Sequence, residues 1–158
     1  MVKEAITIPL MAAGGIASGR AMLAAMALGA DGVQVGSRFA ATVESSAHEN
    51  FKKKIIETEE GGTLLTMKKL VPVRLIKNKF YEQMQEAENR SASLDEMVQL
   101  LGRARAKKGM FEGNLDEGEL EIGQVSGYIH DIKPAAQVVE EMVKEFEEAK
   151  KELGEVAF

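Results

Sequence analysis

The chain has 158 residues, of which 45% are apolar and 28% charged, and its formal net charge is −5 at pH 7. These proportions are typical of a soluble globular protein of one ordinary domain, and they argue against disorder, collagen and coiled coil. The longest uncharged stretch, residues 5–19, is shorter than a membrane span and has no basic segment before it, as a signal peptide would.

Cysteine content and charge distribution narrow the class further. The chain has no cysteine, which excludes disulfides and thiolate sites and leads us to expect a cytoplasmic protein. Basic residues are mostly scattered and only 5% of residues are aromatic, a pattern that argues against a nucleic-acid interface. We expect no membrane span and no nucleic-acid partner.

The N-terminal segment predicts a strand, a glycine turn and a helix. Residues 6–13 are a short apolar run that ends at Gly14-Gly15, which is typical of a buried parallel strand followed by a tight turn. Ser18 is a good helix N-cap, and residues 20–28 predict an Ala/Met/Leu helix. Gly29 then stands where a helix C-terminal glycine is expected.

A second apolar strand, residues 32–36, completes a strand–helix–strand unit and is followed by Ser37. Parallel sheets need both faces covered, and two parallel strands are too few for a stable sheet. Nothing later in the sequence supplies obvious further strands.

The remainder of the chain is predominantly helical by pattern. Amphipathic spacing and capping residues predict helices over 48–57, 79–88, 94–101 and 103–108, the last one stopped at Gly109, and short β segments over 63–66 and 71–76. Residues 112–121 predict an acidic, solvent-exposed loop, whereas residues 123–129 are ambiguous between helix and strand. The clearest helix begins at Pro134, carries one apolar stripe that packs on the core, and ends at Gly154.

The two glycine turns are the candidate binding site. Gly14-Gly15 and Gly36-Ser37 each close an apolar strand and each precede helical sequence. Small residues there would let a ligand touch backbone N–H groups, and neighbouring parallel strands would direct both turns at one phosphate. The alternative is that both turns only reverse the chain. The dinucleotide-binding fingerprint is absent, and no P-loop lysine follows either turn.

The other candidate catalytic or metal-binding residues have ordinary structural interpretations. We interpret His48 as a helix cap and His130 as the partner of a local hydrogen bond with Asp131. No set of residues has the spacing of metal ligands, so we predict no metal site. Because both histidines have these ordinary interpretations, we assign neither of them a catalytic role. Acidic residues 116–121 and lysines 52–54 are interpreted as solvated surface.

Two weaker hypotheses concern apolar and amide side chains. Met22 and Met26 lie one helical turn apart, which favours core filling over a Met-rich binding surface. Gln124, in a stretch of small residues, is a candidate to reach the binding site of a complete protein.

The strand–turn segments resemble one enzyme family over nearly the whole chain. The resemblance is carried by IPLMAAGGIASGR (8–20), ALGADGVQVGSRF (27–39), Glu44, HEN (48–50), residues 103–113 and GQVSG (123–127). In these stretches the chain resembles the nitronate monooxygenases, formerly called 2-nitropropane dioxygenases. The flavin-dependent enoyl-ACP reductases share this pattern. The resemblance is most specific in the first 50 residues and weakest in residues 58–100.

This resemblance implies a fold and a cofactor. The fold is α/β, namely the C-terminal part of a TIM (β/α)8 barrel (its last two βα units) with an added, mostly helical segment. The cofactor is FMN, whose phosphate the resemblance assigns to Gly14, Gly15, Gln34, Val35, Gly36 and Ser37. Many family members have Thr where this chain has Ser37, and both residues supply a hydroxyl.

The resemblance also implies an organisation and an activity. Residues 1–57 would be barrel units, 58–130 a helical lid segment, and 131–158 a C-terminal helix packing on the barrel. The implied activity is FMN-dependent oxidation of alkyl nitronates with O2, the alternative being an enoyl-ACP reductase. Family members are about twice as long, and the catalytic histidine belongs to the other half. We therefore expect a C-terminal fragment that is inactive alone, or a non-catalytic remnant that needs a homodimer or the missing half as partner.

Overall fold

The expected strand–helix–strand unit is present, with shorter strands than the sequence predicts. In the computed structural model, which describes residues 1–156, β1 (Met11–Ala13) pairs in parallel with β2 (Gly32–Gln34). Pro9 has no N–H to donate to a ladder, and pairing starts only after Leu10. Leu10 is instead held by Asp31, whose backbone N–H and carboxylate bind its carbonyl and N–H at 2.7 and 2.8 Å.

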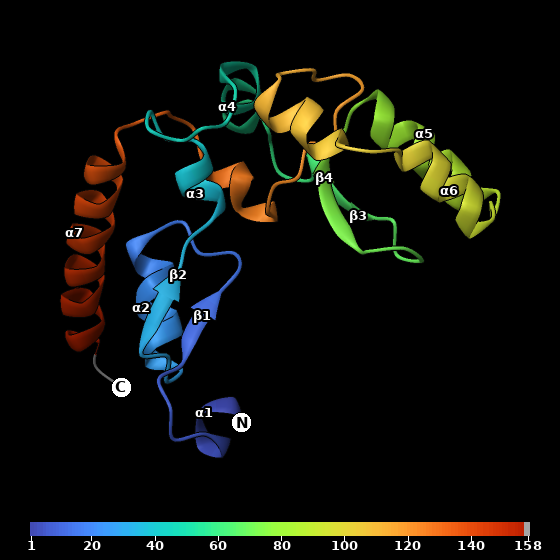
Figure 1. Ribbon diagram of the computed structural model, residues 1–158. Helices are drawn as coiled ribbons and strands as arrows, with labels where there is room; N and C mark the ends of the chain where they lie inside the picture. The colour runs from blue at the N-terminus through green and yellow to red at the C-terminus, as the bar shows by residue number, and fades with distance from the viewer. Residues whose placement is uncertain (157–158) are drawn as a thin grey trace.

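Only one face of this two-stranded sheet is covered, so the expectation of fully buried strands is wrong. Ala12 and Val33 point toward α2 (Gly19–Ala27) and α7 (Ala135–Gly154), where Ile16, Val138 and Met142 form a small core. The Met11 side chain on the other face is 57% exposed. The exposure of side chains alternates along β1, because successive side chains of a strand point to opposite faces. Helices cover only one of these faces (Figure 1).

The covering helices meet through a glycine. Ser18 caps α2 as expected, accepting a hydrogen bond from the Ala21 N–H, and Gly29 is left-handed after the C-terminus of the helix. Gly19 lies directly against the backbone of α7, and its N–H donates to Glu145 at 2.7 Å. Although α7 is the longest helix of residues 1–156, neither it nor any other helix there is long and apolar enough to cross a membrane.

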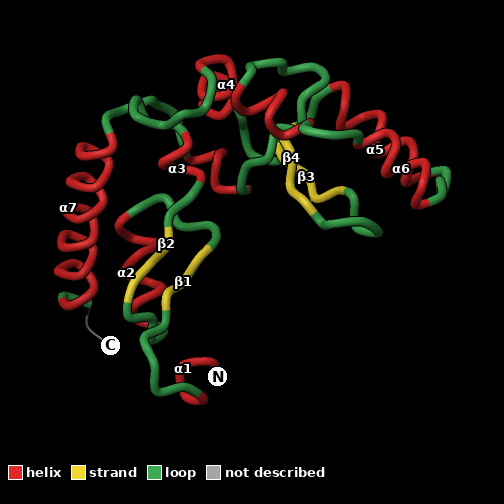
Figure 2. Tube along the Cα trace, viewed as in Figure 1, coloured by secondary structure: helices red, strands yellow, loops and turns green. Residues whose placement is uncertain are grey.

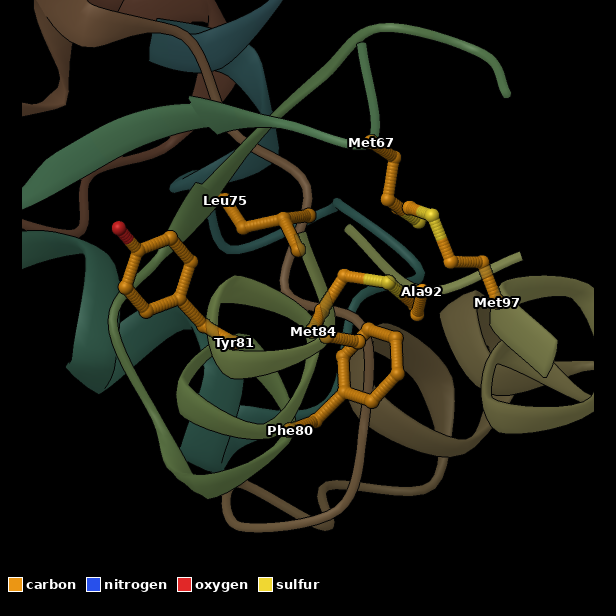
Figure 3. Packing of buried hydrophobic residues seen from close by; sticks show 8 residues of the cluster. Met67, Leu75, Phe80, Tyr81, Met84, Ala92 and Met97 are labelled. Carbon is orange, nitrogen blue, oxygen red and sulfur yellow. The ribbon is translucent and has the colours of Figure 1, made fainter. Parts of the chain in front are cut away.

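A second unit, built from a hairpin and two helices, lies at the other end of the arched chain (Figure 2). β3 (Thr63–Thr66) and β4 (Val73–Ile76) pair antiparallel, and α5 (Lys79–Asn89) and α6 (Leu94–Leu101) follow. The buried side chains that join hairpin and helices are Met67, Leu75, Phe80, Tyr81, Met84, Ala87, Ala92 and Met97 (Figure 3). Three of the nine methionines fill this core, whereas Met26 in α2 is 38% exposed, contrary to expectation.

A third core joins the two ends of the arch. It contains Ala41, Phe51, Ile55, Ile76, Leu120, Ile122 and Ile129. Its helices are α3 (Ser37–Ala40), α4 (Glu49–Ile56) and the 3-10 helix η2 (Gln124–Tyr128), which replaces the ambiguous segment 123–129. The segment 120–122 runs along β4, with Ile76 N–H donating to the Leu120 carbonyl and Ile122 N–H to the Arg74 carbonyl.

Two predictions fail in the segment before it. The helix expected over 103–108 and stopped at Gly109 instead includes a π-helix, η1 (Lys107–Phe111), that passes through Gly109. A Cβ at Gly109 would lie 2.9 Å from the Glu119 carbonyl oxygen, so this glycine serves close packing and not helix termination. The loop 112–121 is likewise not wholly solvated, since Glu119 is 8% exposed and Leu120 is fully buried.

Candidate functional site

The two glycine turns converge on one pocket at the ends of β1 and β2. A pocket of about 200 Å³ is lined by Ala13, Gly14, Gly15, Ile16, Gln34, Gly36, Ser37, Gly123 and Val125. Five of the six predicted binding residues therefore line one space. The sixth, Val35, packs into the core with Ile16 and Met142 and is absent from the lining. This division follows from strand alternation, which sends the Gln34 and Val35 side chains to opposite faces.

The shape of the pocket depends on backbone that only small residues allow. Gly14 and Gly15 have φ angles of +94° and +70°, a left-handed conformation that strains any residue with a Cβ. No atom lies within 4 Å of a Cβ placed on Gly14, Gly15 or Gly36, so these positions face open space. Side chains there would fill the pocket and not a core.

Backbone N–H groups supply the polar lining. Among residues 1–156, the N–H groups of Gly15, Gly36 and Ser37 donate to no protein acceptor. Free N–H groups on glycine-shaped turns are the usual protein cradle for phosphate oxygens. The helix that follows Gly36 is a single turn, α3, so these donors and not a long helix dipole supply the attraction.

Ser37 adds a hydroxyl whose orientation is constrained from the other side of the pocket. Its Oγ accepts the Gly123 N–H at 3.1 Å, which leaves the hydroxyl proton to be donated elsewhere. A Cβ at Gly123 would lie 2.7 Å from this oxygen, so glycine is needed for the approach. Gly123 and Val125 were missed as site residues, although the small-residue run 123–127 was the signal. Gln124, the weak candidate, is not in the lining.

An ion pair between the buried Arg38 and the half-exposed Asp131 fixes the start of α3 behind the pocket. Arg38 is 7% exposed and donates to the Asp131 carboxylate at 2.6 Å and to its carbonyl at 3.0 Å. Burial alone would raise the pKa of Asp131, but hydrogen bonds and charge from Lys133 and Arg38 outweigh it and lower this pKa. The Arg38 charge is thus committed to Asp131. His130, expected to bind Asp131, is exposed and replaced by these two cations.

His48 caps α4 as predicted, and Lys52 departs from prediction. The His48 Nδ1 accepts the Asn50 N–H at 3.1 Å, and its ring lies against Gly113. Lys52, expected on a solvated face, is 2% exposed and donates to the Val43 carbonyl at 3.1 Å. Within residues 1–156, no three His, Asp or Glu side chains gather as metal ligands would.

Glu119, in the predicted loop, has a raised pKa, and stability should therefore depend on pH. Burial first, and then the charge of Glu121, raise its pKa from 4.5 to about 6, against the opposing charge of Arg105. Because folding favours the protonated carboxyl group of Glu119, this group contributes most to the free energy of unfolding below about pH 4.5. That contribution is lost as the pH rises through about 6. We expect Glu119→Gln to stabilise the protein at pH 7.5 by about 1 kcal/mol and to have little effect at pH 4.

Urea unfolding of both proteins at pH 4 and pH 7.5 would measure this difference. Glu112→Gln, at an exposed position of the same segment, is the control and should change stability equally little at both pH values. A stabilisation by Glu119→Gln that is the same at pH 4 and pH 7.5 would show that the raised pKa is not its cause.

The fold and the pocket together define a class of protein, an α/β protein with a glycine-lined pocket at the carboxyl ends of two parallel strands. A family model described as nitronate monooxygenase matches residues 1–145, and the chain belongs to that family. The probable nitronate monooxygenase of Bacillus subtilis is 36% identical over 122 residues, which are 77% of this chain and 35% of the relative. The chain thus spans well under half the length of this curated relative.

Solved structures confirm the α/β class. FabK from Thermotoga maritima is 39% identical with a TM-score of 0.89, and the match covers 96% of this chain and 48% of FabK. Nitroalkane oxidase from Streptomyces ansochromogenes is 31% identical with a TM-score of 0.75, covering 96% and 43% of the two chains. These neighbours are TIM-barrel enzymes, and this chain has the fold of a part of them.

Proposed function

We propose that the chain forms the phosphate-binding part of an FMN-dependent oxidoreductase of the nitronate monooxygenase family. The observation that carries this proposal is the pocket at the ends of β1 and β2, where free N–H groups and the Ser37 hydroxyl converge. Gly14, Gly15, Gln34, Gly36 and Ser37 would contact the phosphate or its neighbouring atoms, and Val35 would hold β2 on its core.

The residues present fit a flavin mononucleotide. The pocket is large enough for one terminal group and not for a whole cofactor, and the three glycines leave it open. Barrel enzymes commonly bind phosphate at the ends of their last two strands, so we propose that β1 and β2 occupy those places. A bound flavin would supply the redox chemistry, accepting electrons from an alkyl nitronate and passing them to O2. This chain would anchor and orient it.

Gly36→Val tests the phosphate cradle. We expect the variant to weaken FMN binding about 30-fold, because a branched side chain would block roughly 2 kcal/mol of charge-assisted hydrogen bonds. Flavin fluorescence quenching during titration measures the affinity. Riboflavin, which has no phosphate, should bind the wild type and the variant with similar affinity.

Gly154→Val is a matched control, since Gly154 also has open space around it but lies at the end of α7, away from the pocket. It should leave FMN affinity unchanged. An equal loss of FMN and riboflavin affinity in Gly36→Val, or no loss of either, would show that the phosphate does not lie in this cradle.

The flavin-dependent enoyl-ACP reductases supply a second candidate activity. The observation that favours it is the greater likeness to FabK, with a TM-score of 0.89, than to nitroalkane oxidase, with 0.75. Because both activities would use the same phosphate cradle, they separate only in a complete barrel. Nitroalkane consumption with O2 and NAD(P)H oxidation with an enoyl thioester would distinguish them.

We propose further that β1 and β2 pair with strands from other barrel units or from a second copy of the chain. We propose the cytoplasm as the location of the protein. The support is the sheet of two strands with one uncovered face, because unpaired strands favour association. Sedimentation of the chain as a stable, folded monomer would contradict this part.

A further inference from the structure

A second cavity lies next to the phosphate cradle and shares three of its residues. It measures about 470 Å³ and is lined by Gly36, Ser37, Ala40, Pro72, Val73, Arg74, Glu121, Ile122 and Gly123. That volume is within the usual range for small-molecule sites. Gly36, Ser37 and Gly123 line both spaces, so the two adjoin.

Arg74 is the one cation in this lining, and its guanidinium is held in place with donors to spare. It lies on β4, half-buried, and its Nη1 donates to the carbonyl and hydroxyl oxygens of Thr63 on β3 at 3.0 and 3.3 Å. In the part of the chain that the structure describes, no carboxylate pairs with Arg74, and its only side-chain hydrogen bonds are the two from Nη1, so no acceptor engages Nε or Nη2. A guanidinium with one anchored edge and one free edge suits a phosphate or carboxylate.

The position of Arg74 relative to the cradle is set by the backbone. Its carbonyl accepts the Ile122 N–H at 3.2 Å, and the next residue, Gly123, donates to the Ser37 hydroxyl at 3.1 Å. The hairpin is thereby tied to the turn after β2 through two consecutive residues. A ligand group at Arg74 would lie beside the group held by Gly36 and Ser37.

We propose that this cavity is a second anion subsite, in which Arg74 binds the phosphate or carboxylate group of a ligand other than the flavin. The cradle lining contains no charged side chain, whereas this cavity contains an arginine and a carboxylate, so the two spaces differ in chemistry. Glu121 lines the same cavity without forming an ion pair with Arg74, and its negative charge lowers the affinity of the cavity for any anion. Arg74 and Glu121 line this cavity and not the cradle, so the subsite would bind a group that the cradle does not hold.

The experiment uses inorganic pyrophosphate as the probe and the ¹⁵N-labelled chain, with and without saturating FMN. We expect a saturable shift of the Arg74 Nε–H resonance, with a dissociation constant that FMN changes less than about twofold. Arg74→Gln assigns this resonance by its absence and should weaken pyrophosphate binding at least about tenfold, followed at the amide of Val73, which lines this cavity and not the cradle. Glu121→Gln keeps the Thr63 bonds and should tighten binding about threefold.

Arg103→Gln, which removes an exposed arginine outside the cavity, is the control and should leave binding unchanged. No saturable shift in the wild type, or equal affinity in Arg74→Gln, would overturn the subsite. Competition between FMN and pyrophosphate would overturn it too, since both would then occupy one shared anion site. If FMN does not bind at all, the cofactor proposal fails, and the titration without FMN still decides the subsite.

Discussion

Gly19→Ala is expected to lower the free energy of unfolding by about 3 kcal/mol, the upper end for overpacking a well-packed contact. The added Cβ would lie 2.2 Å from the Met142 carbonyl oxygen and 2.4 Å from the Phe146 amide nitrogen. Both are backbone atoms of α7, so no side-chain rotation relieves the contact. The helices must separate, and the bond from the Gly19 N–H to Glu145, 2.7 Å long, is weakened.

The sign of this effect is informative because the same change in an unpacked helix stabilises it. Alanine is favoured over glycine in a helix by about 0.5–1 kcal/mol. Gly154→Ala at the end of α7, where no atom lies within 4 Å of the new Cβ, should therefore be neutral or slightly stabilising. Urea unfolding compares the two variants. A Gly19→Ala protein as stable as the wild type would show that α2 and α7 do not pack this closely.

Arg105→Met is expected to lower the free energy of unfolding by about 3 kcal/mol, because it leaves three part-buried carbonyl oxygens without their donor and removes an ion pair. The guanidinium donates to the Leu100 and Leu101 carbonyls at 3.0 Å each and to the Glu117 carbonyl at 2.7 Å. It also contacts the Glu117 carboxylate at 3.3 Å and lies 4.7 Å from the centre of the Phe80 ring. The residue thus ties the end of α6 to the segment after η1.

Arg105→Lys separates charge from geometry. A lysine keeps the positive charge but lacks the planar, five-donor guanidinium, so we expect it to recover less than half of the lost stability. Arg103→Met, two residues away and exposed, should change the free energy of unfolding by under about 0.5 kcal/mol. Thermal or urea unfolding measures all three. Full recovery in Arg105→Lys would assign the effect to charge alone.

The sequence by itself determined the local elements whose signals are short-range. Ser18 and Gly29 marked the two ends of α2, and β3, β4, α5, α6 and α7 lie close to where the pattern placed them. That β3 and β4 pair as a hairpin was not predicted. Gly14-Gly15 and Gly36-Ser37 were identifiable because pairs of small residues directly after apolar strands are typical of tight backbone turns. Family membership followed from the same motif residues, and the site assigned to them stays a prediction.

Only the tertiary structure decided what depends on contacts between distant segments. Gly123 joins the pocket because residues 120–122 run along β4, an arrangement that no local pattern encodes. Lys52 is buried because the Val43 carbonyl accepts a hydrogen bond from its ammonium group, whereas its neighbours in the sequence indicate a solvated face. Glu119 is buried although the residues around it are acidic, because Gly109 permits close approach of its backbone. Burial of a charged side chain is settled by its distant partners, and composition does not report them.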